Sequence, residues 1–127
     1  MTGPAVKSIY PVFFVRDAAQ AAAHYQAAFG FKLDFLFGQP TVFAAVSRGG
    51  HRIYLRGVDA PNFASLAARE SQLILAMVEV DDVEAVFADL VSRGADIAQG
   101  LTRYSWGGTD VHVRDPDGNV FSFVTID

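Results

Sequence analysis

The sequence contains no cysteine among its 127 residues. This absence excludes disulfide bonds, thiolate metal sites and a cysteine nucleophile, and it fits a reducing compartment. Long apolar runs are missing as well, since none approaches the roughly 20 residues of a membrane-spanning helix. Met1 to Lys7 lack the apolar core of a signal peptide. We therefore expect a cytoplasmic protein with no membrane partner.

The chain also lacks a strong excess of charge of either sign. The 14 acidic and 10 basic residues give a net charge of −4 and are scattered along the chain without a basic stripe. Nucleic acid is therefore not an expected partner. The sequence has no Gly-x-Ser-x-Gly elbow, phosphate-binding loop or His-Glu-x-x-His motif. No motif therefore supports a hydrolase, nucleotide triphosphatase or zinc-protease function.

The most informative feature that is present is an internal repeat. Val15-Arg16-Asp17 opens a helical pattern that closes at Gly30, and Val80-Asp81-Asp82 opens a second that closes at Gly94. Asp82 follows Asp17 by 65 positions, and Gly94 follows Gly30 by 64. A long period that occurs only twice indicates a duplicated supersecondary unit, because a solenoid needs at least about three repeats to bury its faces.

Each unit reads as a βαβββ module. The first begins with a strand over Ser8 to Val15, and in each module a helix capped by the aspartate precedes a run of strands with a glycine turn. The chain is predicted to be one α+β domain over residues 1–127, with two tandem βαβββ modules forming mixed curved sheets around a cup and with helices on the outer faces. The predicted parts are module one at about 7–57, a linker with one helical turn at about 58–71 and module two at about 72–127.

Alternation along the strands predicts which side chains face the cup. Large apolar residues with a period of two mark the face covered by the helix, here Ile53, Leu55, Val111, Val113, Phe121 and Phe123. The opposite, cup-facing set is Tyr10, Val12, Phe43, Ala45, Ser47, Arg52, Tyr54, Arg56, Leu75, Met77, Glu79, Asp110, His112, Arg114 and Ser122. Trp106, beside Gly107-Gly108, is expected at the rim. Phe43, Tyr54 and Trp106 are suited to stacking on a planar ligand, and packing of a dimer interface is the alternative.

Together with the repeat, the turn Arg114-Asp115-Pro116-Asp117-Gly118-Asn119 before the last strand resembles the vicinal oxygen chelate superfamily. That group contains glyoxalase I, extradiol dioxygenases, fosfomycin-resistance enzymes and bleomycin-resistance proteins. Trp106-Gly107 and Phe43-Ala44 are most similar to segments of the bleomycin-resistance type that supply aromatic ligand contacts. The resemblance implies the fold, a homodimer and the binding of a small molecule, with an antibiotic as one candidate.

The resemblance also allows the family's metal site to be checked. Its four ligand positions fall on Tyr10, Tyr54, Leu75 and Ser122, none of which is His, Asp or Glu. Neutral tyrosine and serine are poor ligands of the usual divalent ions, and leucine is none. We therefore expect no metal, no other cofactor and no catalytic residue. Glu79, Asp110 and His112 form an alternative set of possible ligands on neighbouring strands, although a hydrogen bond of His112 to a strand neighbour is the simpler expectation.

The resulting hypothesis is a homodimer that sequesters an aromatic-containing small molecule without chemical change. The predicted ligand-binding residues are Tyr10, Phe43, Arg52, Tyr54, Arg56, Trp106, Asp110, His112 and Ser122. Arg52, Arg56 and Arg114 disfavour a cationic ligand and favour a neutral or anionic one. The alternatives are a metal-dependent lyase or dioxygenase with non-standard ligands, and a domain without a small ligand whose cup is filled by its own side chains.

Overall fold

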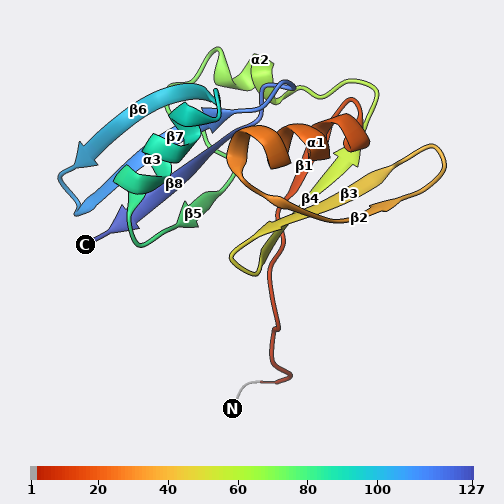
Figure 1. Ribbon diagram of the computed structural model, residues 1–127, viewed down its shortest axis with the longest axis horizontal. Helices are drawn as coiled ribbons and strands as arrows, with labels where there is room; N and C mark the ends of the chain where they lie inside the picture. The colour runs from red at the N-terminus through yellow and green to blue at the C-terminus, as the bar shows by residue number, and fades with distance from the viewer. Residues whose placement is uncertain (1–2) are drawn as a thin grey trace.

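A computed structural model describes residues 3–127 and contains two four-stranded sheets, each with a helix packed on one face (Figure 1). The α+β class and the βαβββ duplication predicted from the repeat are confirmed. None of the helices in the described residues is long and apolar enough to cross a membrane.

Module one forms the first sheet. Its elements are β1 (Val12–Val15), α1 (Ala18–Phe29), β2 (Lys32–Phe37), β3 (Phe43–Arg48) and β4 (His51–Gly57). The strand order is β1-β4-β3-β2, with β1 parallel to β4 and the other pairs antiparallel. Helix α1 packs on β2, β3 and β4, and it leaves the opposite face of this sheet without a helix (Figure 1).

Module two repeats this arrangement. Its elements are β5 (Met77–Glu79), α3 (Val83–Ser92), β6 (Asp96–Tyr104), β7 (Gly108–Arg114) and β8 (Val120–Ile126). The strand order is β5-β8-β7-β6, again with one parallel pair, β5 and β8. Between the modules, the predicted helical turn is present as α2 (Phe63–Ala67).

The two long helices begin and end at the residues that the repeat indicated. The side chain of Asp17 accepts a hydrogen bond from the Gln20 N–H at 3.0 Å, and Asp82 accepts one from the Ala85 N–H at 3.1 Å. These caps satisfy N–H groups that have no partner within the helix. Gly30 follows α1 with φ of 72°, a left-handed conformation that glycine adopts without steric cost.

The helix-covered faces of both sheets merge into one hydrophobic core. Phe121 of β8 lies at its centre: its ring is 5.8 Å from that of Phe13 on β1, 5.4 Å from that of Phe29 on α1 and 5.9 Å from that of Tyr25 on α1. The predicted core residues Ile53, Leu55, Val111, Val113, Phe121 and Phe123 are all buried. The modules therefore pack through their helix-covered sides.

Two sequence-based expectations about the opening strands need correction. The first strand is shorter than Ser8 to Val15, because pairing with β4 begins only at Val12, after Pro11, which has no N–H to contribute. Tyr10 and Leu75 consequently precede their strands, although the Leu75 N–H still donates to the Val120 carbonyl at 2.8 Å. The N-terminal segment projects beyond the sheets (Figure 1), with Ile9 88% exposed.

Candidate functional site

The open face of sheet one carries most of the predicted ligand-binding side chains. Directly paired residues point to the same side of a sheet, and Tyr54 pairs with Val12 on β1 and with Ala45 on β3. By this register the open face includes Val12, Phe14, Lys32, Phe35, Phe37, Phe43, Ala45, Ser47, Arg52, Tyr54 and Arg56. Several of these aromatic side chains are solvent-exposed, including Phe37 at 65%. An exposed cluster of this kind on a monomer indicates a binding surface.

Arg52 lies at the centre of an aromatic and acidic cluster on this face. Its guanidinium carbon is 5.4 Å from the centre of the Phe35 ring, 5.6 Å from that of Tyr54 and 5.9 Å from that of Tyr10. The guanidinium Nε donates to Asp34 at 3.2 Å and Nη1 donates to the Tyr54 hydroxyl at 3.1 Å. These hydrogen bonds, to Tyr54 and then to Asp34, raise the pKa of Arg52, so the guanidinium is charged throughout the physiological range.

Asp34 is the acidic partner of this cluster. Its carboxylate accepts from Ser47 Oγ at 3.0 Å as well as from Arg52, and Lys32 Nζ lies 3.8 Å away. Desolvation alone would raise the pKa of Asp34, but the hydrogen bonds from Ser47 and Arg52 outweigh it and lower that pKa. Asp34 is therefore ionised at neutral pH and compensates part of the positive charge.

The remaining predicted residues of sheet one join the same cluster. The Tyr10 ring packs edge-on against Tyr54, with ring centres 5.4 Å apart. The Arg56 guanidinium lies over Phe43 at 5.2 Å from the ring centre. The structure thus brings together Tyr10, Phe43, Arg52, Tyr54 and Arg56, although Tyr10 lies outside β1.

The corresponding face of sheet two is filled by its own side chains. Asp110, His112 and Ser122 are all buried there. His112 Nε2 lies 2.9 Å from Asp110 Oδ2, and Ser122 Oγ donates to the same oxygen at 3.2 Å. Gln99, from the irregular strand β6, donates to the Tyr104 hydroxyl at 2.8 Å and to Asp110 at 3.5 Å. This network leaves little room for a ligand against Ser122 or Asp110.

The hydrogen bonding of this network does not form a nucleophilic triad. Activation of Ser122 requires a base that accepts the serine proton, which histidine supplies in the known triads. Here Ser122 and His112 both hydrogen-bond to the carboxylate of Asp110, and no hydrogen bond joins the two of them among the described residues. His112 therefore makes a hydrogen bond to a neighbouring strand residue, Asp110, which was the simpler of the two expectations.

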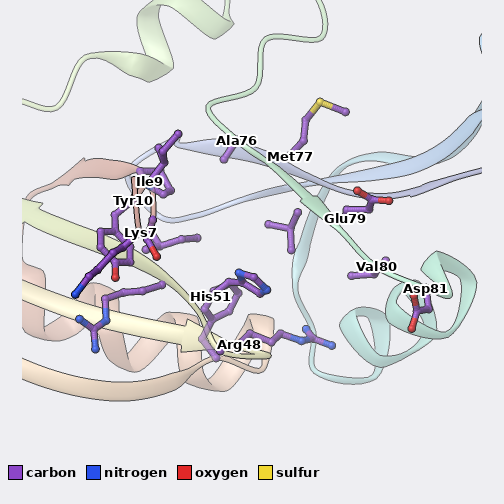
Figure 2. Close-up of a pocket in the computed structure, with 17 residues that line it drawn as sticks. Lys7, Ile9, Tyr10, Arg48, His51, Ala76, Met77, Glu79, Val80 and Asp81 are labelled. Atoms are coloured by element: carbon purple, nitrogen blue, oxygen red, sulfur yellow. The ribbon is translucent and has the colours of Figure 1, made fainter. Parts of the chain in front are cut away.

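A pocket of about 840 Å³ lies between the two modules. Figure 2 shows Lys7, Ile9 and Tyr10 on one side of it and Met77 and Glu79 of β5 on the other. Arg48 of β3 and His51 and Arg52 of β4 complete the basic part of its lining. The volume is within the range of small-molecule sites, and the pocket adjoins the aromatic face through Tyr10 and Arg52.

The edges of the two sheets frame this pocket without joining. β1 and β5 each form an edge of their own sheet, and they do not pair with each other within residues 3–127. The predicted residues consequently fall into two groups on separate sheets. Only Tyr10 and Arg52 of the predicted set line the large pocket, and His112 lines a second pocket of about 110 Å³ together with Glu70 and Arg114.

Trp106 lies apart from both pockets, in the turn between β6 and β7. It is 57% exposed and stacks on Tyr104, with ring centres 5.4 Å apart and an interplanar angle of 14°. Gly108 lies directly beneath the indole, so that a Cβ atom at this position would overlap the ring. Trp106 thus lies exposed at the end of sheet two, and its place at the rim of a ligand site and its role in binding stay predictions.

Possible metal ligands are not grouped in the described residues. No set of three or more His, Asp or Glu side chains in residues 3–127 is arranged to hold a metal ion. Asp110 and His112 are bonded to each other, but Glu79 does not complete a site with them, because β8 lies between β5 and β7. The alternative ligand set of Glu79, Asp110 and His112 is therefore wrong.

Sequence reasoning missed several residues of the site. Asp34 and Phe35 belong to β2. Alternation of Phe35 and Phe37 with Leu36 would have indicated the aromatic face, but Asp34 reaches that same face through a register shift between Leu33 and Phe35 that alternation does not predict. Lys7, Arg48 and His51 line the large pocket because the N-terminal segment and the β3–β4 turn meet opposite β5. That meeting depends on how the modules pack, and strand alternation does not predict it.

Comparison with known proteins agrees with this architecture. The profile of the Glyoxalase/Bleomycin resistance protein/Dioxygenase superfamily matches residues 8–123. Among solved structures, TioX from Micromonospora sp. ML1 is 25% identical, with a TM-score of 0.69 over 95% of this chain and 97% of that one. No significant match was found among curated protein sequences.

Two further structures resemble the fold at lower identity. The bleomycin-binding protein from bleomycin-producing Streptomyces verticillus, complexed with copper(II)-bleomycin, is 22% identical, with a TM-score of 0.73 over 98% of this chain and 99% of that one. A glyoxalase-related enzyme from Clostridium phytofermentans is 14% identical, with a TM-score of 0.77 over the full length of both chains. With its duplicated βαβββ fold and a profile match over nearly its whole length, the chain belongs to the glyoxalase/bleomycin resistance protein/dioxygenase, or vicinal oxygen chelate, superfamily.

Proposed function

We propose that this protein is a metal-free binding protein that sequesters an aromatic-containing small molecule without chemical change. The observation that carries the proposal is the exposed aromatic face of sheet one, with Arg52 and Arg56 packed on its rings, beside a pocket of about 840 Å³. Flat aromatic faces and a few fixed polar groups are the usual lining of a small-molecule site.

The residues at the family's four metal-ligand positions support a binding function in preference to metal chemistry. Tyr10 and Tyr54 pack on each other and on Arg52, so these positions serve the aromatic cluster. On sheet two, Ser122 and Asp110 are already hydrogen-bonded to each other. The bleomycin-binding protein of similar fold provides a precedent for a small-molecule complex on this scaffold, and an antibiotic is one candidate class of ligand.

We further propose that the protein acts as a homodimer in the cytoplasm. The monomer leaves β1 and β5 as unpaired sheet edges, and it exposes apolar side chains along the N-terminal segment and sheet one, including Ile9 and Phe14. Apolar edges of this kind are normally covered in solution. A partner subunit that covers them would also enclose the open face of sheet one and complete the cup.

The binding function is tested with a panel of planar acridine, quinoline, naphthalene and anthraquinone compounds. We expect at least one to bind in calorimetry and to be recovered with unchanged mass after incubation. Phe43→Leu, which removes a ring from the face, should weaken binding, whereas the matched variant Phe63→Leu in α2 should not. Conversion of the bound compound by the protein would contradict sequestration.

A metal assay separates this function from the lyase or dioxygenase alternative. We expect purified protein to contain far less than one Ni, Zn, Fe or Mn ion per chain and to show no metal-dependent glyoxalase or ring-cleavage activity. The four family positions hold Tyr10, Tyr54, Leu75 and Ser122, which are unsuited to these ions. One tightly bound ion per subunit, removed only by a chelator, would overturn the metal-free assignment.

A further inference from the structure

Arg52 occupies the centre of the aromatic cluster that a cationic ligand would otherwise use. Three rings, those of Tyr10, Phe35 and Tyr54, lie within 5.9 Å of its guanidinium carbon. Aromatic rings placed around a common centre attract cations through their electron-rich faces. Because the protein's own guanidinium already fills this position, a cation from outside meets a like charge there, and one face of each ring is already occupied.

The Arg52 guanidinium still has N–H donors that form no hydrogen bond within residues 3–127. Nε is directed to Asp34 and Nη1 to Tyr54, while Nη2 has no hydrogen-bond partner within residues 3–127. Arg52 also lines the large pocket between the modules. A guanidinium has five N–H donors in a planar fork that matches a carboxylate, and the contacts with Asp34 and the rings keep the fork in one orientation.

We propose that the sequestered molecule carries a carboxylate, and that Arg52 binds it while the neighbouring rings stack on the aromatic part. This inference rests on the proposed binding function and adds the charge of the ligand to it. Arg52 is thus a specificity-determining residue, and the site selects acidic aromatic compounds over neutral and cationic ones of the same shape.

The other charged groups around the pocket favour one orientation of such a ligand. Lys7 lines the side that contains Arg52, and Lys32 lies near Asp34. With the single carboxylate of Asp34 against Arg52, Lys7 and Lys32, this end remains positive, and Arg48 adds a further cation to the lining of the pocket. Glu79 and Asp81 line the opposite side and repel a carboxylate, so the anionic end of the ligand is directed toward Arg52.

The test uses three probes of equal size that differ in charge: 2-naphthoate, 2-naphthamide and 2-naphthylmethylammonium. We expect calorimetry at low salt to show 2-naphthoate binding about tenfold or more tightly than the amide, which is the scale of a hydrogen bond to a charged group. The ammonium probe should bind more weakly than the amide. Added sodium chloride should weaken the binding of the naphthoate and leave that of the amide nearly unchanged.

Variants assign the preference to Arg52. Arg52→Gln should remove the advantage of the naphthoate over the amide, whereas Arg52→Lys, which keeps the charge without the planar fork, should retain part of it. As a control, Arg69→Gln, at an exposed residue in the segment after α2, should leave the affinities for the naphthoate and the amide unchanged. Circular dichroism and thermal unfolding of each variant establish that it is folded.

The outcomes separate this inference from the binding function itself. If the amide binds as tightly as the naphthoate, the ligand charge is wrong and the binding function stands. If folded Arg52→Gln keeps the wild-type preference for the naphthoate, Arg52 is not the residue that binds the carboxylate, and this inference is overturned while the binding function stands. If none of the probes binds at millimolar concentration and the wider panel also fails, both proposals are overturned.

Discussion

Tyr25 of α1 donates a hydrogen bond of 2.9 Å to Asp115, 90 residues away in the turn between β7 and β8. The same carboxylate accepts from the backbone N–H groups of Asp117 and Asn119, each at 2.9 Å. The Asn119 side chain then reaches the Phe14 carbonyl on β1 at 2.9 Å. The turn that carries the family resemblance therefore connects the two modules.

Burial shifts the pKa values of the two side chains in this contact, Tyr25 and Asp115. Desolvation, with a further contribution from the charge of Asp115, raises the pKa of Tyr25 well above its ordinary value, so its hydroxyl remains a donor at neutral pH. Desolvation also raises the pKa of Asp115, against the opposing effect of its hydrogen bonds from Asn119 and Tyr25. The modules are thus linked by a buried, fully protonated phenol.

Tyr25→Phe should lower the free energy of unfolding by about 1–3 kcal/mol, because it leaves the buried carboxylate of Asp115 with one donor fewer. Urea denaturation followed by circular dichroism measures this loss. Tyr10→Phe is the matched control, since Tyr10 is half-exposed and its hydroxyl makes no hydrogen bond among the described residues, and it should change stability little. Equal effects of the two variants would contradict the linking role of Tyr25.

Asp34→Asn should change how stability depends on pH. The pKa of Asp34 is lowered in the folded protein, so its stabilising contribution is present above the ordinary carboxyl pKa of about 3.9 and is lost as pH falls through the folded value. We expect the variant to be less stable at neutral pH by about 1 kcal/mol or less, as for other solvent-accessible pairs, and to lose less stability on acidification.

Urea midpoints between pH 2 and 7 test this for Asp34→Asn and for Asp59→Asn, an exposed control without an ion pair in the described chain. If Asp34→Asn lost as much stability on acidification as the wild type does, the pair of Asp34 with Arg52 would not be formed in solution.

Gly108→Ala should displace the Trp106 ring, because the new methyl group would occupy the space where the indole lies. The ring can swing toward solvent, so we expect the unfolding free energy to change by less than about 1 kcal/mol while the tryptophan emission changes. Gly100→Ala is the control, since no heavy atom lies within 4 Å of its added Cβ. Identical emission spectra for the two variants would show that Trp106 does not lie over Gly108.

Within one chain Trp106 lies apart from the pockets, so it can contact the ligand only in a cup completed by a second subunit. In that dimer, Trp106→Ala should weaken binding of the tightest compound of the panel by roughly 1–3 kcal/mol, the contribution of one aromatic stacking contact. Stability should change little because the side chain is mostly exposed. Trp106→Phe should restore part of the affinity. A sharp fall in melting temperature with unchanged affinity would instead make Trp106 a structural residue.

Sedimentation at micromolar concentration should give a mass near twice 13.7 kDa, because a partner is expected to cover the edge and open face of sheet one. Phe14→Lys, at 51% exposure on that face, should shift the mass toward the monomer. Val91→Lys, at 54% exposure on α3, should leave the dimer intact. A wild-type monomer would count against a cup completed by a second subunit.

The repeat determined the fold because its signals are local. Asp17 and Asp82 cap their helices through bonds to N–H groups three residues ahead, and strand alternation decided which side of each sheet is apolar. The buried side chains of Ile53, Leu55, Phe121 and Phe123 follow from that period alone. Short-range geometry and a two-residue period are properties that a sequence displays directly.

The site was only partly predictable, because it depends on contacts between distant segments. Alternation placed Arg52 and Tyr54 on one face, but Asp34 joins them only because the pairing of β2 with β3 shifts register between Leu33 and Phe35. Equivalent alternation placed Asp110, His112 and Ser122 toward the cup, where β6 side chains and their mutual hydrogen bonds close them off. Whether a polar face is open or filled is decided by long-range packing, and only the tertiary structure distinguishes the two sheets.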